Sequence, residues 1–215
     1  MHQDNGHADM QKTQILIADD HAVMRMGLTA LFDTVPEFKI IGEASTGLEA
    51  VDKAHTLKPD IIIMDIMMPI MDGVAATRKI QQDIPETKVL LLTTFGTSDG
   101  IAQALAAGAT GAILKSASNE ELIAAVHTVA SGKLFIAKDV QQLLKSEPPV
   151  QPLTARQLEI LSFVTRGLTN QDIAKALGIR VDSVGQNLST IFAKLGAANR
   201  AEATSIALRK QLLKI

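Results

Sequence analysis

Five short apolar runs alternate with five helical patterns between residues 15 and 131, and this alternation constrains the fold more than any other feature of the sequence. The apolar runs cover residues 15–18, 38–41, 61–64, 89–92 and 112–114. The helical patterns cover residues 23–35, 47–57, 73–83, 97–107 and 119–131. Most runs lack polar alternation, so they are typical of strands buried on both faces. Because parallel neighbours need crossover connections, we predict an α/β fold, a (βα)5 doubly wound parallel sheet with helices on both sides.

A proline-rich stretch separates this pattern from a wholly helical one. Pro148, Pro149 and Pro152 favour an extended spacer, and a short helix is predicted before them at residues 138–145. Later helical patterns cover residues 154–166, 170–177, 181–195 and 200–213. Short helices joined by tight glycine turns predict a small all-α helix-turn-helix domain. The predicted divisions are a disordered tail (1–13), an α/β domain (14–132), a linker with a short helix (133–152) and the all-α domain (153–215).

Charge is distributed unevenly between the two parts of the chain. Residues 1–147 carry 12 basic and 19 acidic side chains, whereas residues 148–215 carry 9 basic and 4 acidic ones. An acidic part can hold a cation and a small basic part can approach nucleic acid, although chance segregation would give the same counts. The sequence has no cysteine, no apolar run long enough to span a bilayer and no signal-peptide pattern at residues 1–11. These features predict a cytoplasmic protein without a membrane partner.

Polar residues follow the apolar runs at the place where open parallel sheets bind ligands, beyond the carboxyl ends of the strands. Asp19 and Asp20 follow the first run, Asp65 the third, Thr93 the fourth and Lys115 the fifth. Three carboxylates close together would repel one another, so we expect a cation among them. Because the expected ligands are oxygen atoms, the ion is predicted to be Mg²⁺ or Mn²⁺.

Asp65 stands alone at its strand end, which makes it the candidate nucleophile for phosphoryl transfer, since a carboxylate can form an acyl phosphate. The Lys115 ammonium and the Thr93 hydroxyl could bind the other phosphoryl oxygens. Each residue also has a simpler interpretation. Asp20 could cap a helix, Thr93 could make a local hydrogen bond, and Lys115 could be a solvated amine. The combination of matched residues at four strand ends favours a shared site.

The segments LIADDH, DIMMPIMDG, LLLTTF and GATGAILK resemble the receiver domain of bacterial two-component response regulators, over residues 14–131. The resemblance implies a sensor histidine kinase as phosphodonor. The roles that it implies are phosphoacceptor for Asp65, Mg²⁺ ligands for Asp19, Asp20, Asp65 and the backbone carbonyl of Met67, and switch or phosphate contacts for Thr93 and Lys115.

The receiver pattern is incomplete at one position. Receivers usually have Tyr or Phe three residues before the lysine, but this chain has Ala112 there and contains no Tyr. Phe95 is a candidate steric substitute for that ring. Met67 and Phe95 also stand where they could cover the acceptor carboxylate, which predicts shielding of the acyl phosphate from water. Alternatively, both side chains pack against neighbouring loops.

The C-terminal segment resembles the LuxR-type helix-turn-helix of the NarL/FixJ family through LTARQ, GLTNQDIA, the KL pair at 194–195 and the NR pair at 199–200. The resemblance implies that residues 170–177 cross the DNA backbone and residues 181–195 lie in the major groove. Relatives commonly carry Lys and His where this chain has Gly185 and Asn187, so we predict weak binding with a shallow salt dependence. The candidate DNA-contacting residues are Arg180, Ser183, Gln186, Asn187, Ser189 and Lys194.

These features together predict a transcription regulator that is phosphorylated on Asp65, binds double-stranded DNA and forms a homodimer when phosphorylated. The helix at residues 200–213 is interpreted either as the dimer contact or as part of the domain core. One alternative function is a pseudo-regulator with a protein-partner output and weak or no DNA binding. Another is a Mg²⁺-dependent aspartyl phosphatase. A phosphatase would leave the basic helical domain unexplained, so we expect the chain not to be an enzyme.

Overall fold

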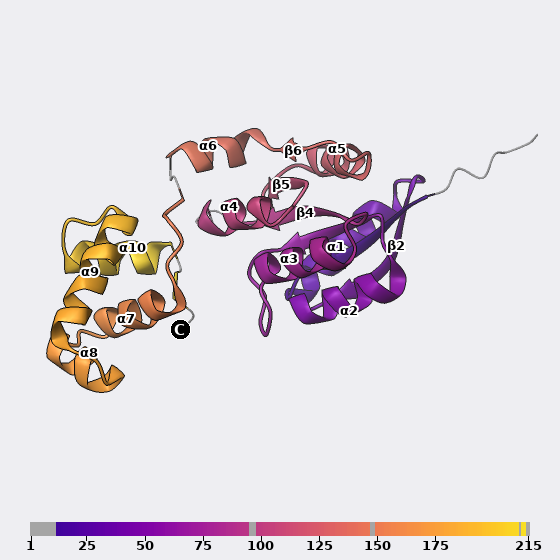
Figure 1. The fold of residues 1–215 in the computed structure, drawn as a ribbon. Coiled ribbons are helices and arrows are strands. Elements are labelled where there is room, and N and C mark those ends of the chain that lie inside the picture. Colours follow the sequence, from indigo (N-terminus) through magenta and orange to yellow (C-terminus); the bar gives the residue numbers. More distant parts are fainter. Residues whose placement is uncertain (1–11, 95–97, 147–148, 211, 214–215) are drawn as a thin grey trace, which may run out of the picture. The chain divides into compact units, whose positions relative to one another are not determined.

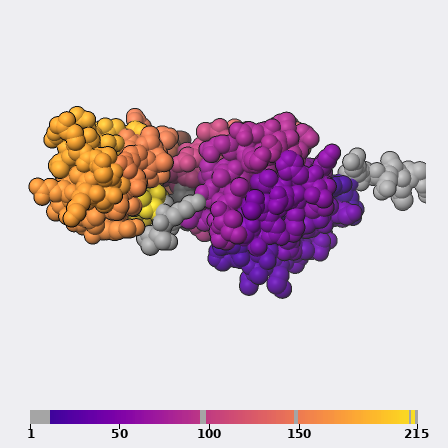
Figure 2. Space-filling model, turned by 60° about the horizontal axis from the view of Figure 1, so that its bottom comes forward, coloured from indigo at the N-terminus to yellow at the C-terminus, as the bar shows by residue number. Residues whose placement is uncertain are grey.

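The structure is a computed structural model that describes residues 12–94, 98–146, 149–210 and 212–213. The chain divides into two compact units, and the main division falls between Ser146 and Glu147. Each unit has its own hydrophobic core and is closely packed (Figure 2). Within the described ranges, no helix is both long and apolar enough to cross a membrane. Residues 1–11 of the predicted tail (1–13) lie outside the described residues, whereas Thr13 already belongs to the first strand, which starts one residue earlier than the predicted α/β domain.

The first unit is a parallel sheet of six strands with the order β2-β1-β3-β4-β5-β6 (Figure 1). Its strands are β1 (Thr13–Ala18), β2 (Phe38–Ala44), β3 (Ile61–Asp65), β4 (Lys88–Thr93), β5 (Gly111–Leu114) and β6 (Phe135–Ile136). The intervening helices are α1 (Ala22–Asp33), α2 (Gly47–Leu57), α3 (Gly73–Asp83), α4 (Ser98–Ala106) and α5 (Asn119–Ala130). The predicted alternation of strand and helix, and the receiver-like fold class, are confirmed.

The central strands are buried on both faces, as their continuous apolar sequences predict. Every residue of β3 is buried, and so is every residue of β5. Short polar side chains begin several of the helices: Thr46, Asp72 and Ser118 each accept a hydrogen bond from a backbone N–H in the first helical turn. The core and these caps together fix the edge of the sheet where the strands end.

The structure differs from the prediction in the segment that was assigned to the linker. β6 adds a sixth parallel strand beside β5, with Ala112 opposite Ile136. Helix α6 (Lys138–Ser146) then places Val140 and Leu143 in the core of the first unit. The apolar residues of LFIAKDVQQLL therefore extend the first unit to Ser146. A two-residue strand is too short to show a period, so the sequence pattern did not reveal it.

The second unit contains the four predicted helices: α7 (Ala155–Thr165), α8 (Asn170–Leu177), α9 (Val181–Leu195) and α10 (Arg200–Arg209). Gly178 and Gly196 adopt left-handed conformations directly after α8 and α9, where a side chain would be strained. Helix α10 ends at Arg209, earlier than predicted. Its Ala203, Ile206 and Ala207 are buried in the core of this unit, which favours the core interpretation of that apolar stripe over the dimer contact.

Candidate functional site

Four neighbouring strands bring the predicted site residues of the first unit to one edge of the sheet. Asp65 and Thr93 are the last residues of β3 and β4. Asp19 and Lys115 directly follow β1 and β5. Because β1 pairs with β3, β3 with β4 and β4 with β5, all in parallel, these strand ends lie at the same edge. The register therefore produces the convergence that the sequence predicted.

A glycine allows the loop after β3 to fold back tightly beside Asp65. The N–H of Gly73 donates to the carbonyl oxygen of Ile66 at 2.9 Å. A Cβ atom at Gly73 would lie 2.1 Å from the carbonyl oxygen of Asp65, closer than any real contact. The start of α3 can approach the backbone of Asp65 this closely only because no side chain is present at Gly73.

The ammonium group of Lys115 bridges two buried carboxylates. Its Nζ lies 2.6 Å from Asp19 Oδ2 and 2.7 Å from Asp65 Oδ2. The side chains of Asp19, Asp65 and Lys115 are 1%, 5% and 12% exposed. The lysine offsets one negative charge, so one unbalanced charge remains between these two carboxylates, before Asp20 is considered.

Burial and charge act in opposite directions on the ionisation of these groups. Burial raises the pKa of Asp65 above its ordinary value, although the Lys115 hydrogen bond and charge oppose the change. Burial lowers the pKa of Lys115, but its hydrogen bonds and charge interactions with Asp19 and Asp65 raise the pKa overall. The Lys115 ammonium is thus firmly held, while the Asp65 carboxylate carries a desolvation cost that another nearby cation would relieve.

Asp20 and His21 complete a group of potential metal ligands with Asp19 and Asp65. One ligand atom from each of these four residues lies within 4.8 Å of the others. His21 Nδ1 lies 2.8 Å from Asp20 Oδ1 and 3.2 Å from Asp19 Oδ1. Three carboxylates whose oxygens lie this close together fit the coordination preference of Mg²⁺ or Mn²⁺. His21 was not among the predicted site residues, although its position beside the acidic doublet was a usable signal.

Thr93 is buried and directly connected to the lysine through the backbone. The N–H of Lys115 donates to the carbonyl oxygen of Thr93 at 2.7 Å, and the Thr93 hydroxyl lies 3.4 Å from the carbonyl oxygen of Thr94. The N–H of Met67 donates to Asp65 Oδ1 at 3.3 Å, and the Met67 side chain is about half exposed. Ala112 is fully buried within β5. Phe95, the predicted substitute for an aromatic residue at this position, lies outside the described residues.

Helix α9 of the second unit carries the predicted DNA-contacting residues, and most of their polar groups bind within the protein. Asn187 Nδ2 donates to the carbonyl oxygen of Ser183, and Ser189 Oγ donates to that of Gly185. Arg180 is exposed, but its guanidinium forms an ion pair with Asp182 at 3.1 Å. Gln186 is exposed on the same helix. This helix therefore presents amide and hydroxyl groups, with its flanking positive charge partly offset.

Lys194, one of the predicted DNA contacts, forms hydrogen bonds within the second unit. Its Nζ donates to the carbonyl oxygen of Pro152 at 2.7 Å and to Gln157 Oε1 at 3.0 Å. These bonds connect the end of α9 to the segment that precedes α7. Lys194 therefore has a structural role within the second unit, which a sequence pattern alone could not distinguish from a DNA contact.

Two family models match the chain and together cover both units. Residues 15–127 match the response regulator receiver domain. Residues 151–207 match the bacterial regulatory proteins of the luxR family. Among curated proteins, the response regulator protein VraR of Staphylococcus aureus is 36% identical over 205 residues, which cover 93% of this chain and 98% of VraR.

Solved structures of response regulators match almost the whole chain. The response regulator ChrA of a heme-sensing two-component system is 34% identical, with a TM-score of 0.58 over 94% of this chain and 99% of ChrA. A complex of the response regulator RcsB with DNA gives a TM-score of 0.66 at 21% identity, over 93% of this chain and 99% of RcsB. The second likeness bears on the fold alone.

Proposed function

Since the chain belongs to the response regulators that join a receiver domain to a LuxR-type DNA-binding domain, we propose that Asp65 accepts a phosphoryl group from a sensor histidine kinase and thereby controls DNA binding. The family regulates transcription in response to phosphorylation. The observation that best supports Asp65 as the acceptor is the Lys115 ammonium, which lies 2.7 Å from its carboxylate at the edge of the sheet.

The proposed reaction is an in-line displacement at phosphorus. A carboxylate oxygen of Asp65 forms a bond to the phosphorus of a phosphohistidine, the P–N bond breaks, and the imidazole leaves with its electron pair and is protonated. Asp19, Asp20, Asp65 and the backbone carbonyl of Met67 would hold Mg²⁺ or Mn²⁺, which supplies positive charge opposite the transferred oxygens. Lys115 would exchange part of its contact with Asp19 for a contact with a phosphoryl oxygen.

Phosphorylation would act on the second unit by shifting a conformational equilibrium. The new charge on Asp65 favours an arrangement in which the Thr93 hydroxyl and the Lys115 ammonium both bind phosphoryl oxygens. These residues end β4 and follow β5, so the shift would alter the surfaces around those strands. We propose that the altered surfaces form a homodimer and that the dimer binds double-stranded DNA. Because the proposed target is DNA, we also propose that the protein is located in the cytoplasm.

DNA binding by a single second unit is proposed to be weak. The candidate contacts are Arg180, Ser183, Gln186, Asn187 and Ser189, and within α9 the only basic residue, Lys194, bonds to the protein itself. Few phosphate contacts give a shallow salt dependence, so a plot of log K against log salt should be less steep than about −6. The same features support a second candidate, a regulator whose output is a protein partner instead of DNA.

Transfer from acetyl phosphate in the presence of Mg²⁺ tests the proposed acceptor. Borohydride reduction converts an aspartyl phosphate to homoserine, and mass spectrometry of peptides then locates the modified position. We expect homoserine at position 65 in the wild type and none in Asp65→Asn. Modification at Asp19 or Asp20 instead, or equal labelling of the variant, would contradict the proposal. Steady turnover of a phosphomonoester by the wild type would instead support a phosphatase.

A further inference from the structure

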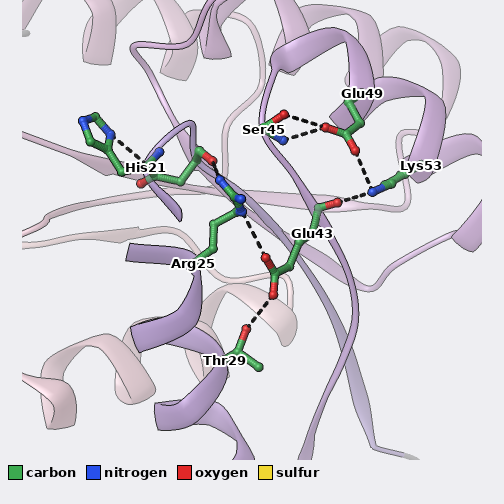
Figure 3. A network of polar contacts seen from close by, with 8 residues as sticks. His21, Arg25, Thr29, Glu43, Ser45, Glu49 and Lys53 are labelled. Atoms are coloured by element: carbon green, nitrogen blue, oxygen red, sulfur yellow. Dashed lines mark hydrogen bonds and ion pairs between the residues drawn. The ribbon is translucent and has the colours of Figure 1, made fainter. Parts of the chain in front are cut away.

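A connected set of polar contacts links the acidic doublet to helices α1 and α2 through β2 (Figure 3). Arg25 lies at its centre, with a side chain that is 17% exposed. The Nη1–H of Arg25 donates to the backbone carbonyl oxygen of Asp19 at 2.7 Å, and its Nε–H donates to Glu43 Oε2 at 3.0 Å. The other oxygen of Glu43 accepts from the Thr29 hydroxyl at 3.2 Å.

The outer part of this network supports Glu43 from the opposite side. Lys53 Nζ donates to the backbone carbonyl oxygen of Glu43 and lies 2.7 Å from Glu49 Oε1. Glu49 Oε2 accepts from the N–H and the hydroxyl of Ser45. The backbone carbonyl group and the carboxylate of Glu43 both have hydrogen-bond partners, so the carboxylate that orients the Arg25 guanidinium has a fixed position.

The hydrogen bond from Arg25 fixes the peptide group that joins Asp19 to Asp20. The N–H of Asp19 donates to the carbonyl oxygen of Ala44 at 3.1 Å, so the residue is held by β2 on one side and by Arg25 on the other. Rotation of this peptide group would change the direction in which the Asp20 side chain leaves the backbone. Arg25 therefore sets the direction of the Asp20 side chain, the more exposed acid of the doublet, through the backbone.

The geometry points to Arg25 as a positioning residue for the divalent cation: it orients the turn that carries Asp19 and Asp20, and it binds the Asp19 carbonyl oxygen and Glu43 through two different nitrogens of one planar group. This inference rests on the proposed function of the acidic site. A lysine at position 25 has a single nitrogen at the end of a flexible chain, so it cannot reproduce the planar, separated donors of the guanidinium. Removal of a group that orients a metal ligand typically weakens metal affinity by about 10- to 100-fold.

The test measures Mn²⁺ binding to the full-length chain, with free Mn²⁺ followed by electron paramagnetic resonance, beside the unfolding of each variant by urea. Arg25→Ala should raise the dissociation constant for Mn²⁺ by about tenfold, at the low end of the range for lost partners of metal ligands. Arg25→Lys should fall between this variant and the wild type. Thr29→Val is the matched control, because it removes a Glu43 hydrogen bond and leaves both Arg25 bonds in place.

The inference is supported if Thr29→Val binds Mn²⁺ like the wild type while both Arg25 variants bind more weakly. It is overturned if the Arg25 variants bind Mn²⁺ as tightly as the wild type, or if Thr29→Val loses as much affinity as they do. Should Arg25→Ala not fold, Arg25→Lys decides against the same control. A wild-type protein that binds no Mn²⁺ would contradict the proposed function as well, which separates that failure from a failure of the role of Arg25.

Discussion

The edge of the sheet in the first unit and the exposed face of α9 in the second use polar residues in different ways. At the sheet edge, Asp19, Asp65 and Lys115 are buried and converge on one another from three strand ends. On α9, Asn187 and Ser189 donate to carbonyl oxygens of their own helix, and Lys194 bonds away from that face. The buried charges at the sheet edge indicate a site that binds one kind of chemical group. The few polar groups that α9 presents indicate DNA binding that depends on other factors, such as dimer formation.

The largest effect should come from removal of the cation at the sheet edge. Lys115→Met would leave two buried carboxylates facing each other, and the free energy of unfolding should fall by about 3 kcal/mol at neutral pH, as expected when one partner of a buried ion pair is removed. Urea unfolding with and without Mg²⁺ provides the measurement. Mg²⁺ should recover part of the loss, because it binds the folded protein.

A matched control for this variant is Lys39→Met, which removes an exposed lysine from β2. It should change the free energy of unfolding by less than about 0.5 kcal/mol, as do most surface substitutions. If Lys115→Met were as stable as this control, the bridge between Lys115 and the two carboxylates would not stabilise the folded state.

A smaller effect is expected from the addition of charge to the sparse face of α9. A Cβ atom at Gly185 would meet nothing within 4 Å, so a longer side chain can be accommodated without displacement of the protein. Gly185→Lys should increase DNA affinity and steepen the plot of log K against log salt by about 0.9, the contribution of one phosphate contact. Fluorescence anisotropy with labelled DNA at several salt concentrations measures both quantities.

Two further variants separate charge from helix stability in that experiment. Gly185→Ala should stabilise the helix by about 1 kcal/mol and leave the salt dependence unchanged. Lys194→Met should also leave the salt dependence unchanged, because its ammonium binds Pro152 and Gln157. A reduced slope for Lys194→Met would show that this residue contacts phosphate after all and that the two regions differ less than the structure indicates.

The smallest effect is expected from Glu49 of helix α2, at the outer end of the polar network around Arg25. Hydrogen bonds lower the pKa of Glu49 from 4.5 to about 2. The hydrogen bond from Lys53 has the largest effect, and the one from the Ser45 backbone has the second largest lowering effect. A lowered carboxylate pKa stabilises the folded state above pH 4.5, and this contribution is lost as the pH falls toward 2. Glu49→Gln should therefore be less stable than the wild type at neutral pH, with a difference that shrinks through this range in urea titrations. A difference in the free energy of unfolding that stays constant with pH would show that the effect comes from packing and not from the ionisation of Glu49.

The sequence was informative where one local pattern had one structural solution. Continuous apolar runs predicted buried parallel strands, and the carboxyl ends of such strands predicted one edge for Asp65, Thr93 and Lys115. The sequence was less informative where the outcome depended on distant contacts. The sequence around Lys194 does not reveal that its ammonium group binds the carbonyl oxygen of Pro152. Strand β6 is recognisable only from its pairing with β5. The bond from Arg25 to the Asp19 carbonyl oxygen likewise depends on Glu43, which is far away in sequence.

The central claim is that phosphorylation of Asp65 controls the second unit. The most direct measurement compares the DNA affinity of the full-length wild type and Asp65→Asn before and after treatment with acetyl phosphate and Mg²⁺, with a fragment selected from random DNA for binding to the wild type. The account predicts that treatment increases the affinity of the wild type and leaves that of Asp65→Asn unchanged. An equal response of the two proteins, or no response by wild type that is demonstrably phosphorylated on Asp65, would contradict it.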